Sequence, residues 1–194
     1  MNTINNNVNN EYLINKSKFI CYLIKVDNIS DIDYNLNYLK QKYNDATHIC
    51  YAYIISNIKR FNDDNEPSGT AGMPILNVLE NNNLNYVLAV VIRYFGGIKL
   101  GASGLVRAYT KSVTLALDKT IIKKINKCLR ISICFNYNET KLIDNLLKDV
   151  NIINKKYDDN IIYTFIILKD DFDKINNLLL LNNIKIIKKE EILF

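Results

Sequence analysis

The sequence has no tryptophan, one histidine, two prolines and six glycines among its 194 residues. All of the glycines and prolines fall between residues 67 and 104, in "PSGTAGMP" and "FGGIKLGASG". Glycine permits backbone conformations and close approaches that other residues resist, and proline fixes the backbone dihedral φ. Segment 67–104 is therefore where we expect tight turns and close contact between the backbone and another group.

Long apolar runs are absent. The longest, "YVLAVVI" and "IIYTFIIL", are much shorter than the roughly 18 residues of a membrane span. The N-terminal "MNTINNNVNNEYL" has neither the basic nor the apolar region of a signal peptide. With 48% apolar and 23% charged residues, the composition is that of a soluble globular protein. We therefore predict a cytoplasmic protein with no membrane partner.

Metal-ligand patterns are also lacking. The four cysteines, Cys21, Cys50, Cys128 and Cys134, form no Cys-x-x-Cys pair. His48 and Cys50 occupy alternate positions of an expected strand and so share a face, but a zinc site needs about four ligands. We predict reduced, mostly buried cysteines, a packed or hydrogen-bonded His48, and neither metal nor cofactor.

Charge of one sign is not strongly dominant. The net charge of +5 permits a polyanionic partner but falls short of the strongly basic domain typical of nucleic-acid binders. The sequence alone therefore neither requires nor excludes RNA.

Residues 1–125 have the patterning of a mixed α/β domain after a loose Asn-rich terminus. Apolar spacing predicts strands at 16–26, 48–56 and 85–95, the last covered on both faces. Helices are expected at 30–45, beginning at Ser30, and at 70–82 and 103–119, with a polar loop at 58–69.

The helix expected at 103–119 has a clear apolar face. We expect Leu105, Val106, Tyr109, Val113 and Ala116 to face inward, and Arg107, Lys111, Thr114 and Asp118 to face solvent.

Residues 126–194 contain no glycine or proline and follow the order βαββαβ, which is the ferredoxin-like split βαβ pattern. The strands are expected at 129–136, 152–157, 161–169 and 184–193, and the helices at 138–150 and 170–183. The sequence thus predicts an α+β protein of two domains, 1–125 and 126–194.

The segment "RYFGGIKLGASGLVRAY" (93–109) places glycines between a strand and a helix, a shape that can bind anions at the helix N-terminus. The residues from 93 to 111 include four bases and no acid. The candidate anion-binding or nucleic-acid-binding set is Arg93, Gly96, Gly97, Lys99, Gly101, Ser103, Gly104, Arg107 and Lys111. The alternative is that the glycines only permit close packing at this junction, and both interpretations stay open.

The two familiar nucleotide motifs are missing from this segment. "GGIKLGAS" lacks the lysine of a Walker A loop, and no Gly-x-Gly-x-x-Gly is present. The sequence therefore predicts neither a nucleotide hydrolase nor a dinucleotide enzyme.

An acidic loop, "NDDNEPSGTAG", precedes this segment and contributes Asp63, Asp64, Glu66, Ser68 and Thr70. The carboxylates could bind Mg²⁺ or act as acid and base, but we favour a solvated loop that forms salt bridges with the basic segment. Ser68 and Thr70 are suited to helix capping. A nucleophilic Ser68 would have only His48 as a base, without a Gly-x-Ser-x-Gly turn.

Four stretches together resemble the IMPACT/YigZ family over roughly residues 11–124: "NKSKFI", "THICYAYII", "DDNEPSGTAGMPIL" and "VVIRYFGGIKLGASGLVRAYTKSV". The resemblance implies a ribosomal-protein-S-five domain-2-like domain followed by a ferredoxin-like domain, a pair similar to the fourth and fifth domains of elongation factor G. It implies translational control for eukaryotic members, which engage the activator of the general-control kinase through an additional N-terminal domain. That domain is not expected here, so the partner is not carried over, and the resemblance implies no catalytic residues.

We therefore expect a non-enzymatic cytoplasmic regulator of translation that binds nucleic acid or the ribosome, with its four bases on one exposed face. The alternatives are a hydrolase-like enzyme acting on a small anionic substrate and a protein-interaction module. A deep pocket joining residues 63–72 and 93–107 would favour the enzyme, and a flat basic surface would favour nucleic acid. Whether the chain is a monomer or a homodimer stays open.

Overall fold

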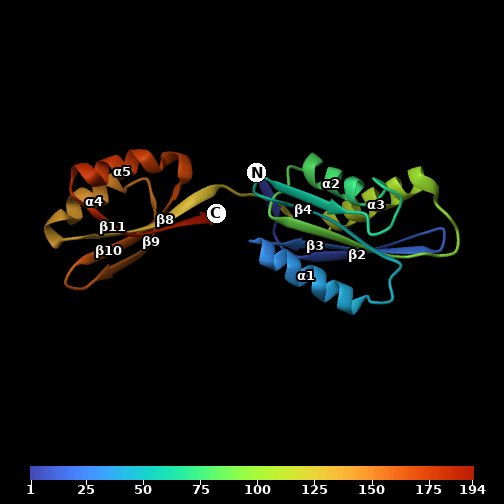
Figure 1. The fold of residues 1–194 in the computed structure, drawn as a ribbon. Coiled ribbons are helices and arrows are strands. Elements are labelled where there is room, and N and C mark those ends of the chain that lie inside the picture. The colour runs from blue at the N-terminus through green and yellow to red at the C-terminus, as the bar shows by residue number, and fades with distance from the viewer. The chain divides into compact units, whose positions relative to one another are not determined.

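The computed structural model describes all 194 residues, which form two compact units, Met1–Lys124 and Ile125–Phe194. Both units combine sheets with helices (Figure 1). The two-domain α+β class expected from the sequence is confirmed.

The first unit is built on a five-stranded antiparallel sheet with the strand order β2-β3-β6-β4-β5. Its strands are β2 (Val8–Ile14), β3 (Ser17–Lys25), β4 (His48–Ile55), β5 (Ile58–Asn62) and β6 (Val87–Tyr94). β6 lies in the centre, and seven of its eight residues are buried, as its continuous apolar run predicts.

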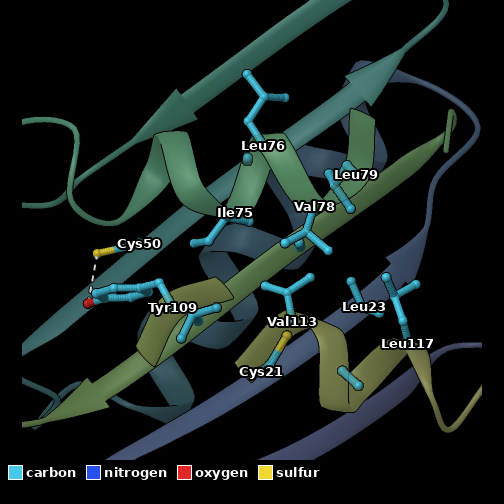
Figure 2. Packing of buried hydrophobic residues seen from close by; sticks show 14 of the residues in the cluster. Cys21, Leu23, Cys50, Ile75, Leu76, Val78, Leu79, Tyr109, Val113 and Leu117 are labelled. Carbon is cyan, nitrogen blue, oxygen red and sulfur yellow. Dashed lines mark hydrogen bonds between the residues drawn. The ribbon is translucent and has the colours of Figure 1, made fainter. Parts of the chain in front are cut away.

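Helices cover both faces of this sheet. α2 (Gly72–Asn81) and α3 (Gly101–Leu117) lie on one face, and α1 (Ile29–Lys42) lies on the other (Figure 1). Between these two helices and the sheet lies one hydrophobic cluster. It contains Ile75 and Leu79 of α2, Tyr109 and Val113 of α3, and Leu23 of β3 (Figure 2). The burial of these side chains supplies the main driving force for folding the unit.

The Asn-rich N-terminus is ordered, and the expectation of a loose terminus is wrong. β1 (Asn2–Ile4) pairs with β7 (Ile122–Lys124), and β2 forms a hairpin with β3. The alternation in "VNNEYLI" that marks β2 is obscured by Asn10, which occupies an inward position and is 8% exposed.

Two other local expectations also need correction. The expected loop 58–69 begins with strand β5, whose five residues are all exposed and therefore show no apolar period. The cap of α1 is Asn28 and not Ser30. The Asn28 side chain accepts from the Asp31 N–H, and the Asp31 carboxylate accepts in turn from the Asn28 N–H, which completes a capping box.

The second unit is a four-stranded antiparallel sheet with the strand order β11-β8-β10-β9. Its strands are β8 (Lys127–Phe135), β9 (Asn151–Tyr157), β10 (Ile161–Leu168) and β11 (Lys185–Leu193), and its helices are α4 (Thr140–Leu146) and α5 (Phe172–Leu181). Short 3₁₀ turns, Tyr137–Glu139 and Lys169–Asp171, precede the two helices. β8 and β9 are consecutive strands of the chain, joined through α4, and in the sheet β10 lies between them. The βαββαβ order therefore forms the expected split βαβ arrangement.

None of the helices combines the length and the apolarity needed to cross a bilayer.

Candidate functional site

The acidic loop and the Gly-rich junction converge in the first unit, on a pocket of about 400 Å³. The loop contributes Glu66 and Pro67, and strand β4 and the residue before it contribute His48 and Thr47. The junction contributes the remaining lining residues, Arg93, Phe95, Lys99, Leu100, Gly101, Ala102 and Leu105. The two motifs therefore enclose a pocket of a size that ligand sites have, and they do not form a flat basic surface.

Glu66 is the centre of a buried polar network beneath this pocket. Its Oε1 atom accepts hydrogen bonds from Arg93 Nη1 at 2.5 Å and from the Tyr109 hydroxyl at 2.7 Å. The side chains of Glu66 and Arg93 are only 3% and 5% exposed. The Arg93 guanidinium also lies over the rings of Phe19 and Phe95, with centroid distances of 5.4 and 5.5 Å.

This geometry corrects the expected position of Arg93. Its charge is compensated by Glu66 within the same chain, so Arg93 does not belong to an exposed basic face. The expectation that the acidic loop pairs with the basic segment holds for Glu66, although that residue is buried rather than solvated.

Asp63 organises the acidic loop through backbone contacts. Its carboxylate accepts hydrogen bonds from the N–H groups of Gly69, Ala71 and Gly72 at the start of α2. The α2 N-terminus is thus satisfied by Asp63, and the expected caps Ser68 and Thr70 do not perform this role; the N-cap residue Ala71 has no side-chain cap.

The two expected caps have other places in the loop. The Thr70 hydroxyl donates to the Pro67 carbonyl at 2.6 Å, and Ser68 is exposed.

Asp64 ties the loop to strand β4. Its carboxylate accepts from the Ile49 N–H at 2.6 Å, and its carbonyl oxygen lies 2.8 Å from His48 Nδ1. Because a carbonyl can only accept, the Nδ1 atom carries the proton in this contact. His48 is thereby fixed with Nε2 at 3.9 Å from Glu66 Oε2.

The three carboxylates of the loop thus have three separate sets of partners. The structure contains no group of three or more His, Cys, Asp and Glu side chains that could hold a metal ion. The alternative of a Mg²⁺ site in this loop is therefore not supported by the arrangement.

Cys50 and Tyr109 close the network on its inner side. The Cys50 thiol donates to the Asp63 carbonyl at 3.0 Å. Its sulfur also lies 3.3 Å from the Tyr109 hydroxyl oxygen (Figure 2). Burial raises the pKa of the Cys50 thiol to about 12, and burial also raises the pKa of the Tyr109 hydroxyl far above its usual value. Cys50 therefore stays a thiol rather than a nucleophilic thiolate, and Tyr109 stays a neutral donor to Glu66.

The remaining bases of the candidate set separate into two places. Lys99 is exposed, lines the pocket and forms no ion pair within the chain. Arg107 and Lys111 line a different groove on α3. The expectation that all four bases share one exposed face is wrong, because the fold buries Arg93 and the helix directs the last two away from the pocket.

The glycines of the junction serve different ends. A Cβ atom on Gly96 would collide with the Lys16 carbonyl group, so this position requires glycine for the β2–β3 hairpin to approach. Gly101 is the first residue of α3, has a φ of +70° and lines the pocket. Ser103 and Gly104 belong to the first turn of the same helix and do not line the pocket. That first turn has no side-chain cap and no acidic residue, so it can receive an anion.

Sequence reasoning missed the apolar part of the site. Phe95, Pro67, Leu100 and Leu105 line the pocket but are not among the candidate residues. The signal that could have found Phe95 is an aromatic residue immediately before the Gly-rich turn. In the structure it follows the last residue of β6 and is 45% exposed.

Comparisons with known proteins agree with this architecture. The Impact N-terminal domain matches residues 15–117. IMPACT family member YvyE of Bacillus subtilis (strain 168) is 41% identical over 151 residues, which cover 73% of this chain and 70% of that protein. IMPACT family member YigZ of Escherichia coli (strain K12) is 34% identical over 151 residues, covering 74% of each.

A crystal structure described as that of a hypothetical protein superposes with a TM-score of 0.67 at 28% identity and covers 95% of both chains. The domain match spans more than half of the chain, and it includes the whole pocket and the network below it. The chain belongs to the IMPACT family.

Proposed function

We propose that this chain is a non-enzymatic, cytoplasmic regulator of translation that binds RNA by holding one unstacked nucleotide in the pocket between Phe95 and Lys99. The observation that carries the proposal is the combination, in one pocket of about 400 Å³, of an exposed aromatic ring, an unpaired cation and an uncapped helix start. These are the parts that recognise the base and the phosphate of a single nucleotide.

The base would lie against the apolar side of the pocket. Phe95 presents an exposed ring, and Pro67, Leu100 and Leu105 supply the apolar surface around it. Stacking of a base on an aromatic side chain contributes about 1–3 kcal/mol and tolerates different bases. The pocket is therefore suited to single-stranded RNA without strict sequence preference.

The phosphate would lie at the start of α3. Lys99 offers its ammonium group there, and the N-terminal turn offers backbone N–H groups together with the positive end of the helix dipole. Glu66 does not oppose the anion strongly, because its charge is compensated by Arg93. One neutralised phosphate gives a shallow salt dependence, with a slope of about −0.7 in log K against log salt for single strands.

Family membership supports the setting of this proposal. The IMPACT family resemblance implies translational control for eukaryotic members, and an RNA ligand is consistent with such a role. The pocket replaces the extended basic face expected from the sequence, so the proposed contact with RNA or with the ribosome is local.

The test is the binding of fluorescent single-stranded RNA, a ten-nucleotide oligouridine and a ten-nucleotide oligoadenosine, followed by anisotropy at two salt concentrations. We expect Lys99→Ala to weaken binding and Lys111→Ala, which removes an equal charge outside the pocket, to leave it unchanged. Equal losses in the two variants, or no binding by the wild type, would overturn the proposal. Competition by free uridine and adenosine monophosphate as strong as that of the oligomers would assign the pocket to a small ligand instead.

A second candidate is an enzyme acting on a small anionic substrate, and two observations favour it. The acidic loop and the Gly-rich junction line one pocket rather than a flat basic surface, and His48 lies in that pocket. The Asp64 carbonyl holds its Nδ1 proton, so that Nε2 in the pocket is oriented as a base requires. Cys50 cannot supply a nucleophile, because burial raises the pKa of its thiol to about 12. Turnover of phosphorylated or carboxylated compounds that is lost in His48→Asn, with the fold intact, would establish this candidate.

A further inference from the structure

A second concave surface lies on α3, away from the pocket. It is a groove of about 500 Å³ between α3 and β2, and it contains the two bases that the pocket does not use, Arg107 and Lys111. Its other lining residues are Tyr12, Ile14, Val106, Thr110 and Thr114. Val106, which the helical pattern assigns to the core, is 38% exposed and faces this groove.

β2, which forms one wall of the groove, is an edge strand. It pairs with β3 and with no other strand. The two-residue turn Asn15-Lys16, with φ of 44° and 61°, makes Ile14 and Ser17 the hydrogen-bonded pair next to the loop. In an antiparallel pair, the backbone N–H and C=O groups of successive residues point alternately toward the partner strand and away from it. Those of Leu13, Glu11 and Asn9 therefore point away from β3, to the free edge of the sheet.

Two side-chain contacts agree with this assignment of the free edge. Lys119 Nζ reaches the Asn9 carbonyl at 3.4 Å, and the Asn10 amide donates to the Glu11 carbonyl at 3.2 Å. By the same alternation the N–H groups of Leu13 and Glu11 point to the free edge, where no hydrogen bond from outside the sheet engages them, so donors are available there.

β2 lacks most of the usual protections of an edge strand, although Lys119 reaches its Asn9 carbonyl. Natural edges carry lysine, proline or a bulge that prevents another strand from pairing. β2 has none of these: its register with β3 is unbroken, and its one charged residue, Glu11, is paired with Lys18 at 3.0 Å. The opposite edge of the sheet, β5, carries Lys59 and Arg60. Of the two edges, β2 is the one suited to accept a further strand.

We propose that this groove binds an acidic peptide segment of a partner protein, which adds to β2 as a further strand of the sheet. Alternate side chains of the added strand would lie on the α3 side and pack against Tyr12, Ile14 and Val106. Arg107 and Lys111 form no ion pair in the chain, so both are available to form ion pairs with carboxylates of the peptide.

The same observations disfavour two other occupants. A second copy of this chain paired through β2 would bring the same two bases of its own toward Arg107 and Lys111, and like charges in an interface are unfavourable. An RNA backbone would use the two bases but would leave the free N–H groups of the strand edge and the apolar floor unused. An extended acidic peptide can use all three features: its backbone pairs with the strand edge, its apolar side chains pack in the groove, and its carboxylates bind the two bases.

The experiment selects binders from a displayed library of random twelve-residue peptides on the full chain, and measures their dissociation constants on variants. We expect enriched peptides to be acidic with alternating apolar residues. Leu13→Pro, which removes an outward N–H, should weaken them at least about tenfold. Leu13→Ala, which removes only the side chain, should leave them unchanged, and Arg107→Ala/Lys111→Ala should also weaken them about tenfold or more.

A measurement on the peptide guards against loss of fold in Leu13→Pro. N-methylation of the peptide backbone at alternate residues should abolish binding at one set of positions and leave it intact at the other. The proposal is overturned if acidic peptides are not enriched, or if Leu13→Ala and Leu13→Pro act alike. It is also overturned if wild-type chain forms a dimer that Leu13→Pro dissociates, or if a ten-nucleotide RNA displaces the peptide and loses affinity in the Arg107→Ala/Lys111→Ala variant.

Discussion

Glu66 and Arg93 form a buried ion pair across 27 residues of sequence, with Arg93 Nη1 donating to Glu66 Oε1. The pair joins the acidic loop to the end of β6 and lies directly beneath the pocket. It explains how an arginine within a basic, Gly-rich segment is neutralised by the chain's own carboxylate. One anion that binds to this basic segment is therefore the chain's own Glu66 carboxylate. Among the cations that line the pocket, only Lys99 is unpaired.

Removing Glu66 should destabilise the first unit strongly. Glu66→Ala leaves the buried Arg93 charge uncompensated and the Tyr109 hydroxyl without its acceptor, so we expect a loss of about 3–5 kcal/mol in the free energy of unfolding. The matched control is Glu11→Ala, whose pair with Lys18 is about half exposed and should cost at most about 1 kcal/mol. Urea unfolding followed by circular dichroism measures both, and equal losses would show that the buried pair has no special role.

Gly96→Ala should disturb the hairpin far more than Gly97→Ala. A methyl group on Gly96 collides with the Lys16 backbone, so the β2–β3 turn must move, at a cost of about 1–3 kcal/mol or more. Gly97 has a left-handed φ of +82°, but a methyl group there would have no atom within 4 Å, so alanine should cost about 1 kcal/mol through backbone strain alone. Thermal unfolding of the two variants measures this difference. A greater fall in melting temperature for Gly97→Ala than for Gly96→Ala would contradict the packing explanation.

The sequence predicts those elements whose apolar pattern is local and complete. The buried run of β6, the inward face of α3 apart from Val106, and the βαββαβ order of the second unit all appear where the pattern indicates. β5 could not be found in this way, because every residue of it is exposed and its strand state depends on pairing with β4. Helical periodicity misplaces Val106, because the groove leaves open a position that the pattern assigns to the core.

The site was predictable only in part, since its decisive contacts join distant segments. The motifs identify the acidic loop and the Gly-rich junction, and salt bridges between the two are the favoured expectation for the acidic loop. Sequence spacing does not indicate that Glu66 is buried, or that Asp63 caps α2 from eight and nine residues upstream. Such contacts are set by tertiary packing, which also brings Phe95 into the pocket.

Alkaline pH should destabilise the first unit through Cys50. Burial raises the pKa of this thiol from its ordinary 9.0 to about 12. Between these two values the unfolded chain has lost the proton and the folded chain retains it. The unfolded state then binds fewer protons, so the free energy of unfolding falls as pH rises, by up to about 1.4 kcal/mol per pH unit for one group.

The contribution of Cys50 is fully present below about pH 9 and is lost as pH approaches about 12. Urea unfolding at several pH values measures the slope, and Cys50→Ala should make it shallower by the share of one proton. Other groups of the first unit with raised pKa values, among them Cys21, Tyr94 and Tyr109, contribute to the slope that remains. An identical slope in Cys50→Ala and wild type would show that the thiol does not take part.

Phe95→Ala should separate base stacking from general apolar contact in the proposed RNA site. Loss of stacking is expected to weaken oligouridine and oligoadenosine binding by about 1–3 kcal/mol, or roughly 5- to 150-fold. Ile98→Ala is the matched control, because Ile98 is as exposed as Phe95, at 45%, lies three residues away and does not line the pocket. Because Phe95 also covers Arg93, the folded stability of both variants is measured alongside anisotropy. A stable Phe95→Ala variant that binds RNA as the Ile98→Ala variant does would place the nucleotide outside this pocket.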